Sequence, residues 1–330
     1  MNLSSVLVIG AGTMGQGIAQ WFAQQLIPTI ICDNNPAQAE KARAAIFTSW
    51  DQLSTKGKLT ADDVTKMKAL LAVKPWIEAP RNTSLIIEAI IENLEIKKSL
   101  FRDLTQHFSP STVISSNTSS FPMKLMAEAL PKERRGNFLG LHFFNPATLM
   151  KLVEVIRGPE TNKQLADDLY TWFEKHGKQP AQCADAPGFI VNRVARNFYG
   201  EPLRIVGHDD ESKMKEVDRI LKEVVGFKMG PFELMDLIGI DVNYAVTCSV
   251  WEAFHQAEDA MVAWIATANE FGDPIPKPST PTRYSGQWRM RAPKSLHAAL
   301  ASRAKEEGVS LNTLAITLLA QGLEKNKTNQ

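Results

Sequence analysis

The sequence predicts an α/β fold: a doubly wound sheet of parallel strands, then a small all-helical domain, then a short basic tail. Two observations predict the sheet. A buried β-branched run at 6–9 meets a glycine-rich turn, and strand-like apolar runs then alternate with amphipathic helical runs. A third observation marks the tail, because four prolines fall within residues 273–286 and basic residues dominate the chain after them.

The composition is that of a soluble globular protein with room for two domains. Of the 330 residues, 44% are apolar and 22% charged, and the net charge of +1 favours no particular partner. Three cysteines (Cys32, Cys183 and Cys248) lie too far apart for a disulfide framework or a metal site, which favours a reducing cytosol. No apolar run reaches the length of a membrane span, so we expect a cytoplasmic protein without a signal peptide.

The first strand, expected over 6–9, leads into the pattern GxGxxG and then a helix. This context predicts a dinucleotide site of the Rossmann type, in which glycines permit a tight turn and close approach of a pyrophosphate to the helix N-terminus. A glycine-rich turn without a ligand is the alternative. The residues expected to contact the cofactor here are Gly10, Gly12, Thr13, Met14 and Gly15.

The second strand ends at Asp33, 18 residues past Gly15, where a carboxylate can bind the adenosine ribose hydroxyls. Asn34 and Asn35 follow, with no arginine to receive a 2′-phosphate. This pattern predicts NAD rather than NADP as the cofactor.

Residues from about 36 to 72 form a helical arm that a plain dinucleotide fold does not need. Its basic side chains suit an anionic, phosphate-bearing substrate, although a solvated helical face explains most of them equally well. They are Lys41, Arg43, Lys56, Lys58, Lys66 and Lys68.

The alternation then continues with a buried strand at 84–90, an amphipathic helix at 93–108 and a strand at 112–120. Because the carboxyl ends of parallel strands meet at one crevice, polar residues that follow them are expected to face substrate and nicotinamide. These residues are Glu92, Asn117, Ser119 and Ser120. Ordinary turn chemistry is the alternative for each of the four.

A predicted hairpin, bent near residue 148, carries two titratable residues inside apolar strands. Opposed residues of an antiparallel hairpin have numbers with a constant sum, so His142 and Glu154 would face each other. A carboxylate there fixes the imidazole tautomer and stabilises an imidazolium, which is the arrangement of a general base with its orienting group. A buried histidine satisfied by a neighbour is the alternative.

Six sequence blocks between residue 4 and about 255 resemble the 3-hydroxyacyl-CoA dehydrogenase family, most closely its bacterial 3-hydroxybutyryl-CoA type. They are VIGAGTMGQGIAQ, IIEAIIENLEIKK, SSNTSSF, GLHFFNPATLMKLVEVI, DAPGFIVNRV and MGPFELMDLIGIDVNYAV. The resemblance implies NAD-dependent oxidation of a 3-hydroxyacyl-CoA to a 3-oxoacyl-CoA, with His142 as the general base oriented by Glu154. It also implies a homodimer formed through the helical domain.

The same resemblance assigns further site residues. It implies that Ser119 and Asn192 contact the substrate beside His142 and Glu154. It implies that Asp33, Glu92, Lys97 and Asn145 contact the cofactor, and that Ser49 and Lys56 on the arm hold the CoA moiety.

The sequence divides into a cofactor domain (1–184), a helical domain (185–256), a helix with a proline-rich linker (257–284) and a tail (285–330). Helices are expected after Pro187-Gly188, up to Gly226, and twice within 230–254. Beyond about 255 the family pattern breaks, because its closing stretch of the K-x-G-x-G type is missing.

The tail resembles the ribbon-helix-helix end of HicB-type antitoxins. Residues 275–330 carry nine lysines and arginines against three acids, and Gln287, Arg289 and Arg291 share one face of a predicted strand. Such a ribbon can enter the DNA major groove, so this set is the candidate DNA contact. A short dimerisation tail or an unpaired strand is the alternative.

Three functions therefore compete. The first is an NAD-dependent 3-hydroxyacyl-CoA dehydrogenase with no metal, and the second a DNA-binding, dimerising protein with a vestigial dehydrogenase half. The third is an NAD-dependent dehydrogenase of another substrate class, which the helical arm argues against.

Overall fold

The computed structural model describes residues 3–207, 210–240, 243–244, 246–248, 250–252, 301–303 and 305. The chain separates into a sheet unit, residues 1–194 with 246–255, and a helical unit, residues 195–245 with 256–330. No helix among the described residues has both the length and the apolar composition of a membrane span.

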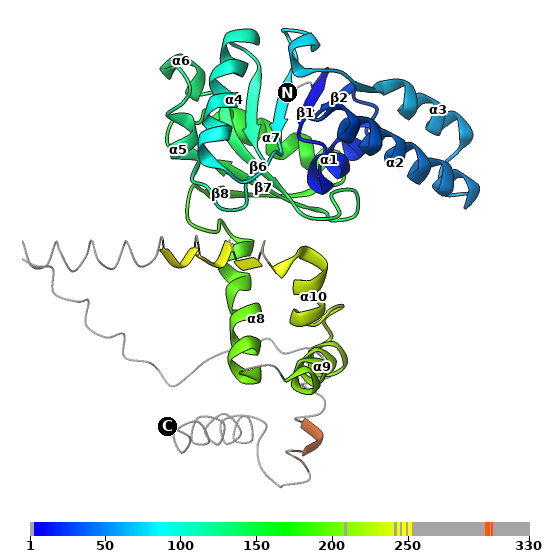
Figure 1. The fold of residues 1–330 in the computed structure, drawn as a ribbon, viewed down its shortest axis with the longest axis vertical. Helices are drawn as coiled ribbons and strands as arrows, with labels where there is room; N and C mark the ends of the chain where they lie inside the picture. Colours follow the sequence, from blue (N-terminus) through cyan, green and yellow to red (C-terminus); the bar gives the residue numbers. More distant parts are fainter. Residues whose placement is uncertain are drawn as a thin grey trace, which may run out of the picture. The chain divides into compact units, whose positions relative to one another are not determined.

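The described part of the sheet unit contains one eight-stranded sheet in the order β3-β2-β1-β4-β5-β6-β7-β8 (Figure 1). Only β6 and β7 pair antiparallel; the other neighbours pair parallel. This doubly wound order confirms the predicted fold class. The strands are Val6–Ile9 (β1), Thr29–Cys32 (β2), Leu71–Val73 (β3), Leu85–Glu88 (β4), Val113–Ser116 (β5), Phe138–Phe143 (β6), Leu152–Arg157 (β7) and Gln179–Ala184 (β8).

Helices cover the sheet and build the helical unit. They are Thr13–Gln24 (α1), Pro36–Thr55 (α2), Ala61–Leu70 (α3), Leu94–His107 (α4), Met123–Ala127 (α5), Lys132–Arg135 (α6), Lys163–Lys175 (α7), Val191–Val206 (α8), Glu211–Ile220 (α9) and Pro231–Ile238 (α10). A 3₁₀ turn occupies Trp76–Glu78 (η1) and a π-helical turn Leu221–Val225 (η2).

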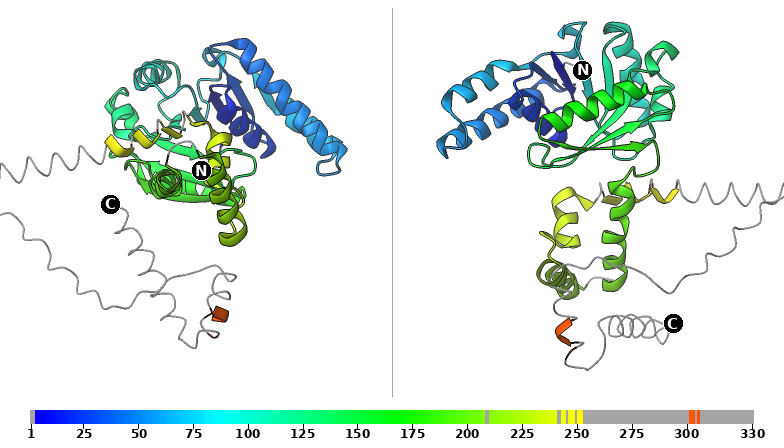
Figure 2. Two further views of the ribbon diagram at one scale, coloured as in Figure 1. Left: turned by 60° about the horizontal axis from the view of Figure 1, so that its bottom comes forward. Right: turned by 180° about the vertical axis from the view of Figure 1, so that it is seen from behind.

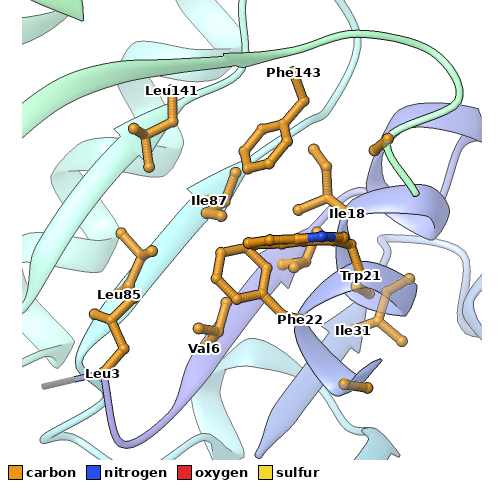
Figure 3. Close-up of a cluster of buried hydrophobic side chains, with 14 of the residues drawn as sticks. Leu3, Val6, Ile18, Trp21, Phe22, Ile31, Leu85, Ile87, Leu141 and Phe143 are labelled. Atoms are coloured by element: carbon orange, nitrogen blue, oxygen red, sulfur yellow. The ribbon is translucent and has the colours of Figure 1, made fainter. Parts of the chain in front are cut away.

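The central strands β1, β4, β5 and β6 are buried on both faces of the sheet, as uninterrupted apolar strands predict. Along β1 the side chains alternate: Val6 and Val8 belong to one core, Leu7 and Ile9 to the other. Figure 3 shows the first core, where Trp21 of α1 lies among apolar side chains from several strands.

Within the range predicted as a helical arm lie α2 and α3, which run side by side (Figure 2). Asn35 caps α2 by accepting from the Ala37 N–H, and Thr60 forms a capping box with Asp63 at α3. The last residues of the predicted arm belong instead to β3, whose parallel pairing with β2 extends the sheet.

Several elements of the sheet unit were not among the predicted ones, including α5, α6, α7 and β8. The start of α8 also differs from expectation, because residues 187–190 form a turn and the helix begins at Val191. Gly188 and Phe189 have φ angles of 71° and 48°, a left-handed conformation that cannot continue a right-handed helix.

In the described part of the helical unit, α8, α9 and α10 lie where helices were expected. α9 ends at Ile220, and the π-helical turn η2 continues it to Gly226, whose φ of 88° suits a glycine at a helix C-terminus. The Asp218 carboxylate accepts the N–H groups of Phe232 (3.0 Å) and Glu233 (3.0 Å) and so anchors the start of α10.

Candidate active site

A cleft of about 1120 Å³ opens where β1, β2 and β4 end and α1, α2 and α4 begin. This is the edge at which doubly wound sheets bind nucleotides. Five of the predicted cofactor residues line it: Gly10, Gly12, Thr13, Met14 and Asp33.

The three glycines of the turn differ in what surrounds the position of a Cβ atom. A Cβ on Gly10, where φ is 105°, would lie 2.3 Å from the Ala89 carbonyl oxygen, and one on Gly15 would lie 1.8 Å from the Gly10 carbonyl oxygen. Gly12 caps α1 without a side-chain hydrogen bond, and a Cβ there would meet no protein atom within 4 Å. The open space at a helix N-terminus fits the pyrophosphate of a dinucleotide.

Asp33 directly follows β2 and is hydrogen-bonded to the glycine turn. Its carboxylate accepts the Ala11 N–H at 2.7 Å and the Asn35 N–H at 3.0 Å. The same carboxylate lines the cleft, as a ribose-binding acid must. Burial, and then the nearby Asp33 charge, raise the pKa of Cys32 to about 12, so this cleft residue is a neutral thiol.

His142 and Glu154 face each other in the register predicted from the sequence. The His142 Nδ1 and Glu154 Oε2 atoms are 2.6 Å apart, and the two residues are 5% and 0% exposed. A carboxylate only accepts, so Nδ1 is the donor in this contact, and in the neutral imidazole Nε2 then has the free lone pair. The pair therefore has the geometry of a base and its orienting acid.

The second carboxylate oxygen of Glu154 is held by the turn before α8. Oε1 accepts the N–H groups of Ile190 at 3.0 Å and Val191 at 2.8 Å. These donors, at the positive end of a helix, compensate a buried negative charge. Sequence reasoning missed them, because only the left-handed conformation at Phe189 directs both N–H groups towards the strand.

Ser119 lies on the other side of the imidazole. Its Oγ is 3.2 Å from His142 Nε2, and its carbonyl oxygen accepts the Asn192 amide Nδ2 at 3.3 Å. The structure thus brings the four predicted catalytic residues together. A substrate oxygen beside Ser119 would also lie beside the imidazole that can take its proton.

Glu92 and Lys97 belong to a polar network under the turn that carries Ser119. Burial raises the pKa of Glu92, but the Lys97 charge and hydrogen bonds from Thr118, Lys97 and Ser120 outweigh it and hold that pKa below its usual value. The Lys97 ammonium is buried against Glu88 and Glu92. Glu88 was not a predicted site residue, although a carboxylate inside an apolar strand is the signal that identified Glu154.

Asn145 is exposed on the loop between β6 and β7. Lys178 anchors this loop by donating from Nζ to the carbonyl oxygens of Ala147 (2.5 Å) and Met150 (2.7 Å). The ammonium also lies 4.7 Å from the centre of the Trp21 ring. Burial lowers the pKa of Lys178 to about 8.

The predicted CoA residues both lie on the arm. Ser49 is half-buried and accepts from Gln20 Nε2 at 3.3 Å. Lys56, exposed at the end of α2, lines a shallow pocket of about 290 Å³ with Thr48 and Asp51 among its neighbours. The candidate DNA contacts Gln287, Arg289 and Arg291 lie outside the described residues.

Comparison with family models gives three matches. Residues 5–186 match the model described as the NAD binding domain of 3-hydroxyacyl-CoA dehydrogenase. Residues 188–277 match the model described as the C-terminal domain of 3-hydroxyacyl-CoA dehydrogenase. This match extends past residue 256, where the sequence predicted the helical domain to end. Residues 274–319 match the HicB family.

Individual relatives agree with these matches. The chain is 42% identical over 257 residues to 3-hydroxyadipyl-CoA dehydrogenase of Escherichia coli K12, covering 78% of this chain and 53% of the relative. It is 38% identical to human mitochondrial hydroxyacyl-coenzyme A dehydrogenase, covering 72% and 77% of the two chains. A crystal structure of E. coli 3-hydroxybutyryl-CoA dehydrogenase superposes with a TM-score of 0.72 at 40% identity. The match covers 78% of this chain and 54% of the chain in that crystal structure. The chain thus spans about half the length of the E. coli relatives it matches.

Proposed function

The chain belongs to the 3-hydroxyacyl-CoA dehydrogenase family, and from that premise we propose that it oxidises a 3-hydroxyacyl-CoA to a 3-oxoacyl-CoA, reversibly. Residues 5–186 are the family's NAD-binding domain. The observation that carries the proposal is the chain of contacts from the half-buried Ser119 to the buried pair His142 and Glu154, beside the sheet edge where the cofactor cleft opens.

The proton is handled by His142. Its Nε2 accepts the proton of the substrate's C3 hydroxyl, while Ser119 Oγ, 3.2 Å away, holds that oxygen in place. The Glu154 carboxylate then stabilises the imidazolium through Nδ1. NAD, when bound, supplies the acceptor for the hydride that leaves C3.

Glu154 can serve this purpose because its charge is fixed in place. Its two oxygens accept three donors, one from the imidazole and two from the backbone at the start of α8. A preorganised carboxylate needs no rearrangement when the imidazole becomes charged, which is how enzymes lower the cost of charge development.

The NAD-binding residues act through shape and charge. Gly12 and the N-terminus of α1 would hold the pyrophosphate, and Asp33 the ribose hydroxyls. A negative carboxylate at that point repels a 2′-phosphate, which favours NAD. We propose that Asn145, exposed on the loop that Lys178 anchors, contacts the nicotinamide half.

We propose that the helical arm, α2 and α3, binds the CoA moiety of the substrate. Lys56 presents an exposed ammonium at the end of α2, and Ser49 lies two turns earlier on the same helix. We expect Lys56→Ala to raise KM for a CoA thioester without changing kcat, because the contact is remote from the reacting carbon. Lys58→Ala, two residues further along the chain, is the matched control.

The experiment that tests the function compares acetoacetyl-CoA with free acetoacetate as oxidants of NADH. We expect rapid loss of NADH absorbance with the thioester and little with the free acid, since the free acid lacks the CoA moiety and therefore binds weakly. Equal rates with both would contradict the substrate class, and no rate with either would contradict the activity.

A homodimer is the assembly we propose for this enzyme. Among the described residues of the helical unit, Phe227, Leu237 and Ile240 are 48%, 62% and 65% exposed. Large apolar side chains exposed in one unit are typical of an interaction surface. Light scattering that gives the mass of a single chain would contradict this assembly.

DNA binding by the tail is a second candidate function, favoured by the match of residues 274–319 to the HicB family. Gln287, Arg289 and Arg291 alternate with Trp288 and Met290, which is the pattern of a ribbon with one polar face. A gel shift that weakens with salt and with Arg289→Ala plus Arg291→Ala would support it. Absence of binding at low salt would exclude it.

A further inference from the structure

We propose that Lys178 is a positioning residue, which holds the loop of residues 144–151 against α1 and thereby sets Asn145 for its contact with the nicotinamide half of NAD. This proposal rests on the proposed function, because that function assigns the cofactor contact to Asn145. Lys178 acts here through the loop.

The Lys178 side chain is buried, and its ammonium meets the loop at two points. The residue is 5% exposed, and its Nζ donates to the carbonyl oxygens of Ala147 at 2.5 Å and Met150 at 2.7 Å. These acceptors lie 31 and 28 residues earlier in the chain. Asn145 precedes Ala147 by two residues, so the first contact fixes the segment that carries Asn145.

The backbone at Lys178 gives this side chain a fixed base. The Lys178 N–H donates to the Phe173 carbonyl oxygen of α7 at 3.0 Å. The next N–H, that of Gln179, donates to the Lys151 carbonyl oxygen at 2.8 Å, at the far end of the loop. The pairing of β7 with β8 begins directly after these residues. Movement of the loop relative to Lys178 is therefore restricted from both ends.

The loop lies on α1, the helix whose N-terminus faces the space assigned to the pyrophosphate. A Cβ on Gly17 would lie 3.3 Å from the Ala147 Cβ, so a glycine permits this close approach. The Lys178 ammonium lies 4.7 Å from the centre of the Trp21 ring and 5.9 Å from that of Phe143, two side chains of the core in Figure 3. Lys178 therefore joins the loop to the helix that begins the cofactor site.

Burial of this ammonium is unfavourable by itself. Burial is the sole cause of the lowered pKa of Lys178, about 8, and no described carboxylate offsets it. A methionine could fill similar space without removing a charge from water. What the lysine adds is a pair of directed hydrogen bonds to the loop, which an apolar core residue cannot make.

The test compares Lys178→Met with Lys175→Met in the full chain. Lys175 is an exposed lysine in the last turn of α7, so its substitution removes the same charge three residues away. Lys178→Gln, a shorter side chain that keeps an NH₂ donor, is measured beside them. The melting temperature of each variant shows whether it folds.

Two dissociation constants are measured by calorimetry, that of NADH and that of ADP, which lacks the nicotinamide and its ribose. We expect the Kd for NADH to rise by about tenfold in Lys178→Met, the loss of about one polar contact, with the Kd for ADP unchanged. Lys178→Gln should give a smaller rise for NADH. Lys175→Met should change neither constant.

A double-mutant cycle shows whether Lys178 acts through Asn145. If it does, the double variant Asn145→Ala, Lys178→Met should bind NADH as weakly as Asn145→Ala alone, because the contact is already absent. Fold-changes that multiply in the double variant would mean that the two residues act independently, and would overturn the proposal.

The remaining outcomes separate this proposal from the proposed function. An unchanged Kd for NADH in Lys178→Met would overturn the proposal. Equal losses of NADH and ADP affinity, or failure of both Lys178 variants to fold, would overturn it in favour of a purely structural residue. Unchanged NADH affinity in Asn145→Ala would overturn it together with the Asn145 contact. The titrations use no acyl substrate, so a chain without turnover would contradict the proposed activity alone, and the binding constants would still decide the function of Lys178.

Discussion

Glu154→Gln is the substitution with the best defined consequence. The Gln side chain has one oxygen and one NH₂ group where Glu has two acceptors. The N–H groups of Ile190 and Val191 both point at the Oε1 position, so the amide oxygen must occupy it. The NH₂ group then faces His142 Nδ1, which has to become the acceptor.

The tautomer of the imidazole is therefore reversed. With Nδ1 accepting, the proton resides on Nε2, the atom that faces Ser119 and must take the substrate proton. The imidazolium also loses a carboxylate partner. Opposite charges about 4 Å apart contribute about 4 kcal/mol at an effective dielectric constant of about 20. That energy corresponds to about 10³-fold in kcat.

The fold should survive the change, because the amide fills the same volume and satisfies the same backbone donors. The assay is kcat for NADH oxidation by acetoacetyl-CoA, with the melting temperature measured beside it. Glu160→Gln is the matched control, since Glu160 is an exposed acid that pairs with Arg135 at 2.8 Å. A loss of less than about tenfold in a folded variant would refute the orienting function of Glu154.

Three further predictions concern the glycine turn and Lys178. Gly12→Ala should leave the melting temperature unchanged and abolish NADH binding measured by fluorescence titration, because the added Cβ meets only the space assigned to the pyrophosphate. Gly15→Ala should instead destabilise the fold by more than about 1 kcal/mol, seen as a lower urea midpoint, because its Cβ would lie 1.8 Å from the Gly10 carbonyl oxygen. Raising the pH from 8 towards 10.5 should stabilise the protein relative to Lys178→Met, because the pKa of Lys178 is lowered from 10.5 to about 8 and only the unfolded chain still binds the proton in that window.

Each of these predictions has a contradicting result. NADH binding retained in Gly12→Ala would place the pyrophosphate elsewhere. Unchanged stability of Gly15→Ala would mean that the strand and helix can separate at no cost. A pH-independent difference between the unsubstituted chain and Lys178→Met, in urea unfolding, would show that the Lys178 ammonium keeps its ordinary pKa.

Part of the site was predictable because it depends on local rules. The pairing of His142 with Glu154 follows from counting across one hairpin, and the cofactor turn from a glycine motif between a strand and a helix. The arm was predictable because α2 and α3 carry their own caps at Asn35 and Thr60.

The rest depends on contacts between distant segments. Glu88 meets Ser116 because β4 and β5 are neighbours in the sheet, and no local pattern states which strands are adjacent. The strand β8 contains Pro180 and is partly exposed at the sheet edge, so it lacks the apolar signal of the central strands. The left-handed backbone conformation at Phe189 could not be predicted either, since it is set by the fold around the turn.

The most direct test of the account is turnover by the purified full chain with NADH and acetoacetyl-CoA, compared with that of His142→Gln. The account predicts that NADH absorbance falls with the unsubstituted chain and stays constant with the variant, while both proteins bind NADH equally. Equal loss of NADH in the two samples would contradict the central claim that the His142 imidazole, held by Glu154, transfers the substrate proton.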